Sequence, residues 1–125
     1  MLWNALLGVA FALEEPSPPG TPVDLGHQVK AAAEQLCSVV QVPVSEDQQA
    51  ALLCWAVDVR AGISGPEDRL EDSGVVRCLN RGEYQLAGAE LIKWCFRGNH
   101  VDKAALERRR TEQRHFFAAL HRSGA

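Results

Sequence analysis

A cluster of prolines divides the sequence near its beginning. Four of the eight residues in EPSPPGTP, residues 15–22, are proline. Proline lacks the N–H that helix interiors and β-ladders require, so neither kind of element continues through such a stretch. We therefore predict a linker over residues 14–22, a helix over residues 1–13 before it, and a helical lobe over residues 23–120 after it. At 125 residues the chain is expected to form one domain, residues 1–125.

The segment before the prolines, LWNALLGVAFAL, is almost entirely apolar. Leu2, Leu6, Val9 and Leu13 recur at helical spacing, which predicts a helix that is covered on most sides. A membrane span needs roughly 20 apolar residues, and no Lys or Arg precedes the run as in a secretory signal. We interpret it as a core helix, with an interfacial or partner-docking helix as the alternative.

The rest of the chain shows helical periodicity and clear helix starts. Ser45 with Gln48 forms the pattern of a capping box, Thr21 precedes Pro22, and Ser73 precedes a short apolar run. Clustered β-branched residues and sustained alternation are absent from the sequence. We predict an all-α fold, a compact bundle of about six helices. After the first, they lie at about residues 23–40, 45–62, 75–79, 83–96 and 102–120, with a polar loop at 63–72. In the last helix the inward side is expected to carry Ala105, Arg109, Phe116 and Leu120.

Charge and cysteine spacing exclude several kinds of site. The net charge of −3 is too small to indicate a nucleic-acid-binding protein. The four cysteines form no CxxC pair and the four histidines are scattered, so we predict no metal and no cofactor. The cysteines stand among apolar residues, which favours buried free thiols and a reducing compartment. We expect the cytoplasm of a bacterial host cell, and the periplasm stays open as an alternative.

Three blocks of the sequence resemble a known family. SGVVRCLNRGEYQLAGAELIKWCFRGN at residues 73–99, followed by ALERRRTEQRHFF at residues 105–117, is similar to the C-terminal lobe of the phage lysozymes (endolysins, muramidases). Upstream, VPVSEDQQAALLCWAVDVRAG is similar to a helix of the same family. The resemblance covers roughly residues 28–120. It implies a helical lobe and, in family members, hydrolysis of the glycosidic bond of peptidoglycan.

The same resemblance points to what this chain lacks. Family members place a Glu at the end of their first helix, an Asp about nine residues later and a Thr about six after that, on a small β-hairpin lobe that forms the far wall of the cleft. Here Glu14 and Glu15 stand where the acid would be, and Asp24 follows Glu15 by nine residues, but Lys30 stands where the Thr would be. The nine residues PSPPGTPVD cannot build a sheet lobe. The resemblance therefore implies that the catalytic lobe is missing and that Glu14 and Glu15 are vestigial.

The run Arg108, Arg109 and Arg110 has a similar interpretation. Because family members place an Arg of the last helix near the catalytic Glu, an ion pair to the vestigial acid is implied. Three successive helical residues fan over about 200°, so at most two share a face. A phosphate or nucleic-acid patch is the alternative, but aromatic residues for base stacking are not interleaved on that face.

Three functional hypotheses follow. The favoured one is a non-catalytic protein that binds a macromolecule, a protein or a second copy of itself, through Trp3, Leu7 and Phe11 of the N-terminal helix, in a phage, prophage or bacterial setting. The second is a residual peptidoglycan hydrolase or a cell-wall-binding module. The third is a membrane-associated lysis accessory anchored by residues 2–13.

Overall fold

A computed structural model describes the backbone of residues 25–123 and the side chains of residues 26–118. This part of the chain contains five α-helices, one 3₁₀ turn and two very short strands. These are α2 (Leu25–Val39), α3 (Glu46–Arg60), η1 (Leu70–Asp72), α4 (Gly74–Asn80), α5 (Tyr84–Leu91), β1 (Phe96–Arg97), β2 (His100–Val101) and α6 (Lys103–Ser123). The all-α prediction is confirmed, with five of the expected helices in place. The predicted helix at residues 1–13 and the predicted linker at 14–22 lie outside the described residues.

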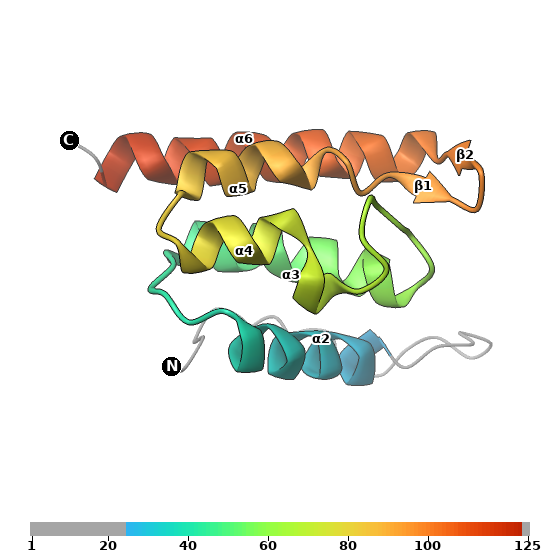
Figure 1. Cartoon of the computed structure of the whole chain (residues 1–125), viewed down its shortest axis with the longest axis horizontal. Coiled ribbons are helices and arrows are strands. Elements are labelled where there is room, and N and C mark those ends of the chain that lie inside the picture. The colour runs from blue at the N-terminus through green and yellow to red at the C-terminus, as the bar shows by residue number, and fades with distance from the viewer. Residues whose placement is uncertain (1–24, 124–125) are drawn as a thin grey trace.

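The helices stack in three tiers (Figure 1). α2 forms one side, α3 and α4 lie in the middle, and α5 and α6 form the other side. α3 makes extensive contacts with both α2 and α6, while α4 and α5 pack on each other. Consequently α3 is the central element. Side-chain contacts between α3 and α6 join the middle tier of helices to the tier formed by α5 and α6.

The predicted helix starts at Ser45 and Ser73 are confirmed. The Ser45 hydroxyl accepts a hydrogen bond from the Gln48 N–H at 3.1 Å, and the Gln48 side chain accepts one from the Ser45 N–H at 2.9 Å. The buried Ser73 hydroxyl accepts from the Val76 N–H at 3.2 Å, and the Glu67 carboxylate accepts from the Gly74 N–H at 3.0 Å. These side chains satisfy backbone donors that a helix leaves unpaired in its first turn.

The core is centred on two tryptophans. Trp55 of α3 and Trp94, just after α5, meet edge to face, with ring centroids 5.6 Å apart and planes at 80°. Every helix contributes buried apolar residues around them: Val29, Ala32, Leu36 and Val40; Ala51, Leu52, Leu53 and Ala56; Leu70; Val75, Val76 and Leu79; Ala87 and Leu91; and Phe116. In the last helix Ala105, Arg109 and Phe116 are buried as predicted, while the side chain of Leu120 lies outside the described residues.

The fifth helix was predicted too long. It ends at Leu91 rather than near Phe96, and the chain turns so that the Trp94 ring enters the core. Phe96 then pairs with Val101 in the β1–β2 hairpin, which the sequence analysis did not predict, and also forms a bridge to Ser64 in the supposed loop 63–72. The helix ends early because the turn after Leu91 allows the Trp94 ring to pack against Trp55 in the core.

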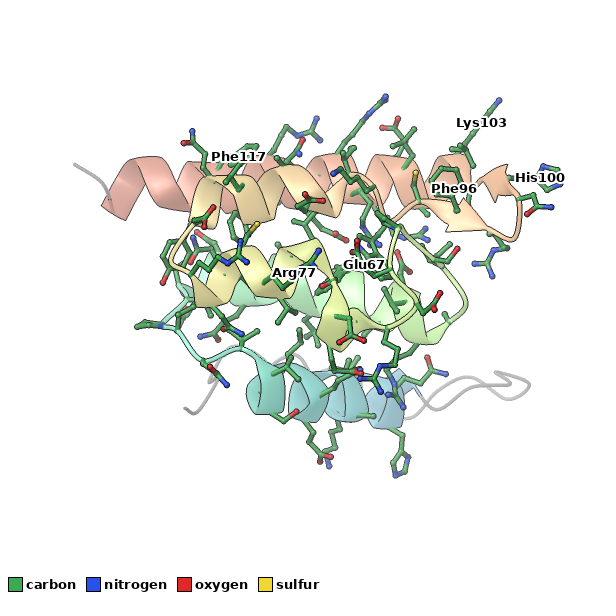
Figure 2. All side chains as sticks on the ribbon, viewed as in Figure 1. Glu67, Arg77, Phe96, His100, Lys103 and Phe117 are labelled. Carbon is green, nitrogen blue, oxygen red and sulfur yellow. The ribbon has the colours of Figure 1, made fainter. Side chains whose placement is uncertain are left out.

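The side chains of the hairpin strands are exposed to solvent. Phe96 and Val101 are 38% and 49% exposed, and Figure 2 shows Phe96, His100 and Lys103 at this end of the molecule. A carboxylate then starts the last helix, since Asp102 Oδ1 accepts from the Ala105 N–H at 3.0 Å.

The cysteines are free thiols, as predicted, but the prediction that they are buried is wrong for most of them. Cys95 is buried, Cys37 and Cys78 are half-buried, and Cys54 is exposed. Cys54 directly precedes Trp55 on α3, and a step of about 100° around the helix moves it away from the core.

Candidate functional site

The residues predicted from the sequence fall into two groups. Glu14 and Glu15, the vestigial acids, and Trp3, Leu7 and Phe11, the predicted docking residues, all lie outside the described residues. The arginine run is described, and it lies near the start of α6, against α3. The site is therefore built upward from these arginines.

Arg109 is completely buried and binds two carboxylates. Its Nη2 donates to Asp58 Oδ2 at 2.6 Å and to Glu112 Oε2 at 2.5 Å. Further donations reach two backbone carbonyls, Nη1 to Trp94 at 3.4 Å and Nη2 to Cys54 at 3.5 Å. One guanidinium thus connects α3, α6 and the segment after α5. Arg109 occupies the inward side of the last helix, where the periodicity predicted it.

Arg108 and Arg110, the neighbours of Arg109 in the run, are more exposed to solvent than Arg109. Arg108 donates through Nε to the same oxygen, Asp58 Oδ2, at 2.6 Å, but its side chain is 46% exposed. Arg110 pairs with Glu107 at 3.0 Å on the solvent side of α6. As predicted, no more than two of the three arginines share a face. Asp58, Arg108, Arg109 and Glu112 are called the Arg109 cluster below.

The electrostatics of the Arg109 cluster are dominated by burial. Removal from water raises the pKa of the Glu112 carboxyl to about 7, against the attraction of Arg109, which lowers it. The nearby Asp58 carboxylate adds to the increase. Two buried atoms, Arg109 Nε and Glu112 Oε1, have no hydrogen-bond partner in the part of the chain that the structure describes. When all its groups are charged, the cluster therefore leaves one donor and one acceptor without a hydrogen bond in the interior.

The chemistry that the Arg109 cluster supports is structural. Hydrolysis of a glycosidic bond needs two carboxyl groups on opposite sides of the sugar, one of them free to donate a proton to the leaving oxygen. Asp58 and Glu112 instead bind the same nitrogen of one guanidinium. They were not among the predicted site residues. A signal was available for Asp58, a single acid inside the apolar run LLCWAVDV, while Glu112 lies within the block ALERRRTEQRHFF that resembles the family.

The described residues contain neither a metal-ligand cluster nor a membrane-spanning helix. Between residues 26 and 118, whose side chains are described, His, Cys, Asp and Glu form no group of three that could hold a metal ion. Among helices α2 to α6 none is long and apolar enough to cross a membrane.

Comparison with known proteins identifies a family. The family model for phage lysozyme matches residues 23–113, from just before α2 to the middle of α6. No curated protein matches the chain. The matched region contains the whole Arg109 cluster and both core tryptophans.

Proposed function

The chain belongs to the phage lysozyme family, and from that premise we propose that it is a non-catalytic member that acts by binding a macromolecular partner, most simply a protein. Two parts of the chain support this proposal: the helical lobe, which is well formed, and the segment where the family's catalytic residues would stand.

One observation carries the proposal. The position fifteen residues after Glu15, where the family resemblance implies a Thr on a hairpin strand, is Lys30, and it lies inside α2. Leu25, Gly26 and His27, which resemble the family's glycine-containing strand segment, are also part of α2. A helix in this place supplies no opposing wall for a second catalytic group.

The described acids support the same interpretation. Asp58 and Glu112 are engaged with Arg109 in the interior, and Asp102 caps α6 and binds Arg97 at 3.1 Å. Each of these carboxyl groups has a structural role. None of them is placed to act on both faces of a sugar.

The catalytic part of the proposal is tested with a turbidity assay on purified bacterial cell walls, between pH 4 and pH 8. We expect the wild-type protein and the Glu14→Gln and Glu15→Gln variants to leave the walls unchanged, beside an active lysozyme as a positive control. Turnover by the wild type that is lost in either variant would refute the proposal in favour of a residual hydrolase.

The binding part is tested with the tagged full chain in a pull-down from a bacterial host lysate. The retained protein is identified by mass spectrometry and its binding is confirmed with purified components. We expect retention to be lost when Trp3, Leu7 and Phe11 are all changed to Ala. It should be kept in Leu86→Ala, which removes an exposed apolar side chain on α5.

Equal retention of the triple variant would contradict the assignment of the docking residues. Retention on purified sacculi alone would support a wall-binding module instead. We further propose that the protein acts in the cytoplasm of the host cell, which fractionation of that host with antibodies against the chain would test.

A further inference from the structure

Two charged side chains of the Arg109 cluster, Arg109 and Glu112, are removed from water without a full set of hydrogen bonds. Arg109 is fully buried and Glu112 is 5% exposed, yet one atom of each lacks a hydrogen-bond partner among the described residues. The two acids approach the same guanidinium nitrogen, so their negative charges lie close together when both are ionised. Ionisation of Glu112 also places charge on Oε1, a buried oxygen without a hydrogen-bond partner among the described residues, and this burial is what makes the ionised form of Glu112 costly.

The described groups with the largest effect on the charge of Glu112 lie on α3 and α6. α3 contributes Asp58 and Cys54, and α6 contributes Arg108 and Arg109. The pKa of the Cys54 thiol is raised by desolvation and then by Glu112, so this group stays neutral when Glu112 ionises. The arginines attract the Glu112 carboxylate, while Asp58 and the loss of water oppose its charge.

We propose that the Arg109 cluster is a proton-operated latch, which holds the first half of α6 against α3 while Glu112 is protonated and loosens when Glu112 ionises. A carboxylate at this position gains hydration only if α6 moves away from α3. A protonated Glu112 gains little from hydration, so the closed position of α6 is retained. Arg108 and Arg109 then each donate a 2.6 Å hydrogen bond to the same oxygen, Asp58 Oδ2.

The direction of the pH effect follows from linkage. An opened α6 exposes Glu112 to water with an ordinary pKa near 4.5, whereas the closed form holds the pKa of Glu112 at about 7. The closed form is therefore fully favoured below pH 4.5, loses its advantage as the pH rises from 4.5 to 7, and changes little above that. Between pH 5 and pH 8 the opening equilibrium is expected to shift by on the order of fiftyfold.

Amide hydrogen exchange of the full chain tests the latch. Opening constants are measured at pH 5, 6, 7 and 8 and corrected for intrinsic exchange rates. We expect amides of residues 103–113 in α6 to lose roughly fiftyfold in protection across this range. Amides of α2, which lies on the opposite side of the molecule from α6 (Figure 1), should change much less.

Two variants provide the matched comparison. In Glu112→Gln the side chain cannot ionise, so the protection of α6 should no longer depend on pH. Glu107→Gln changes an acid on the exposed side of the same helix and should keep the wild-type behaviour. A fall in α6 protection that persists in Glu112→Gln, or an equal fall in α2, would overturn the latch.

A measurement on the wild-type protein covers the case in which Glu112→Gln fails to fold. The ¹³C shift of the Glu112 carboxyl, followed from pH 4 to pH 9, should show a midpoint near 7. A midpoint below 5 would mean that Arg109 keeps the carboxylate ionised throughout, and the proposal would be wrong.

Discussion

Arg108 and Arg109 allow the effect of burial on an ion pair to be measured within one helix. Both donate to the same atom, Asp58 Oδ2, and both distances are 2.6 Å. The Arg108 side chain is 46% exposed, while that of Arg109 is 0% exposed. Replacing each with Met keeps most of the apolar stem and removes the charge, so the two variants differ in burial and in the further hydrogen bonds that Arg109 makes in the interior.

The expected free-energy changes differ severalfold. An exposed ion pair contributes about 0–1 kcal/mol, because water competes for both partners. Breaking a buried pair costs about 3–5 kcal/mol, because the partner charge is left without compensation in the interior. Arg109→Met also deprives Glu112 and the Trp94 carbonyl of their donor. We therefore expect Arg109→Met to destabilise the protein by about 3–5 kcal/mol and Arg108→Met by less than about 1 kcal/mol.

Urea unfolding at pH 7 measures both changes. Trp55 and Trp94 report on the core by fluorescence, and circular dichroism reports on the helices. Equal m-values in the three proteins show that the compared states bury similar surface. For a domain of this size 1 kcal/mol corresponds to roughly 4 °C, so the melting temperature of Arg109→Met should fall by roughly 12–20 °C. Equal losses in the two variants would refute the conclusion that burial, rather than geometry, determines the contribution of each arginine.

The remaining predictions concern packing and caps, and all use the same urea assay. Gly65→Ala should cost about 1–3 kcal/mol, because a Cβ there would lie 2.4 Å from the Trp94 ring, and a loss below 0.5 kcal/mol would contradict the packing. Gly82→Ala should cost only about 1 kcal/mol, since its φ of 76° is unfavourable but nothing lies within 4 Å. Ser73→Ala should cost about 1 kcal/mol through the lost cap, and Ser73→Thr should retain most of it. Asn80→Ala should cost about 1–2 kcal/mol, because its side chain donates to the Val39 carbonyl at 2.9 Å and accepts from the Gln41 N–H at 2.7 Å, and an unchanged midpoint would be inconsistent with this link.

The sequence predicted what local chemistry determines. Ser45 and Ser73 start helices because a hydroxyl at the first position satisfies nearby N–H groups, which requires no knowledge of the rest of the fold. Helical spacing likewise placed Arg109 among the inward residues of the last helix.

Long-range packing determines what the sequence did not predict. The hairpin at residues 96–101 depends on Trp94 turning toward Trp55, about forty residues earlier in the chain. Similarly, Asp58 became a partner of Arg109 only because α3 and α6 pack together. The predicted roles of Glu14, Glu15, Trp3, Leu7 and Phe11 stay predictions, because these residues precede the described part of the chain.

The bridge between Ser64 and Phe96 has a consequence for the order of folding. Its two backbone hydrogen bonds, at 2.8 and 3.2 Å, close a loop of some thirty residues that contains α4 and α5. Closing an unstructured loop of this length costs on the order of 3 kcal/mol of chain entropy. Prior pairing of α4 with α5 shortens the effective loop, so we expect that pairing to precede the bridge and the hairpin. Weakening the bridge should then accelerate unfolding while leaving the folding rate nearly unchanged.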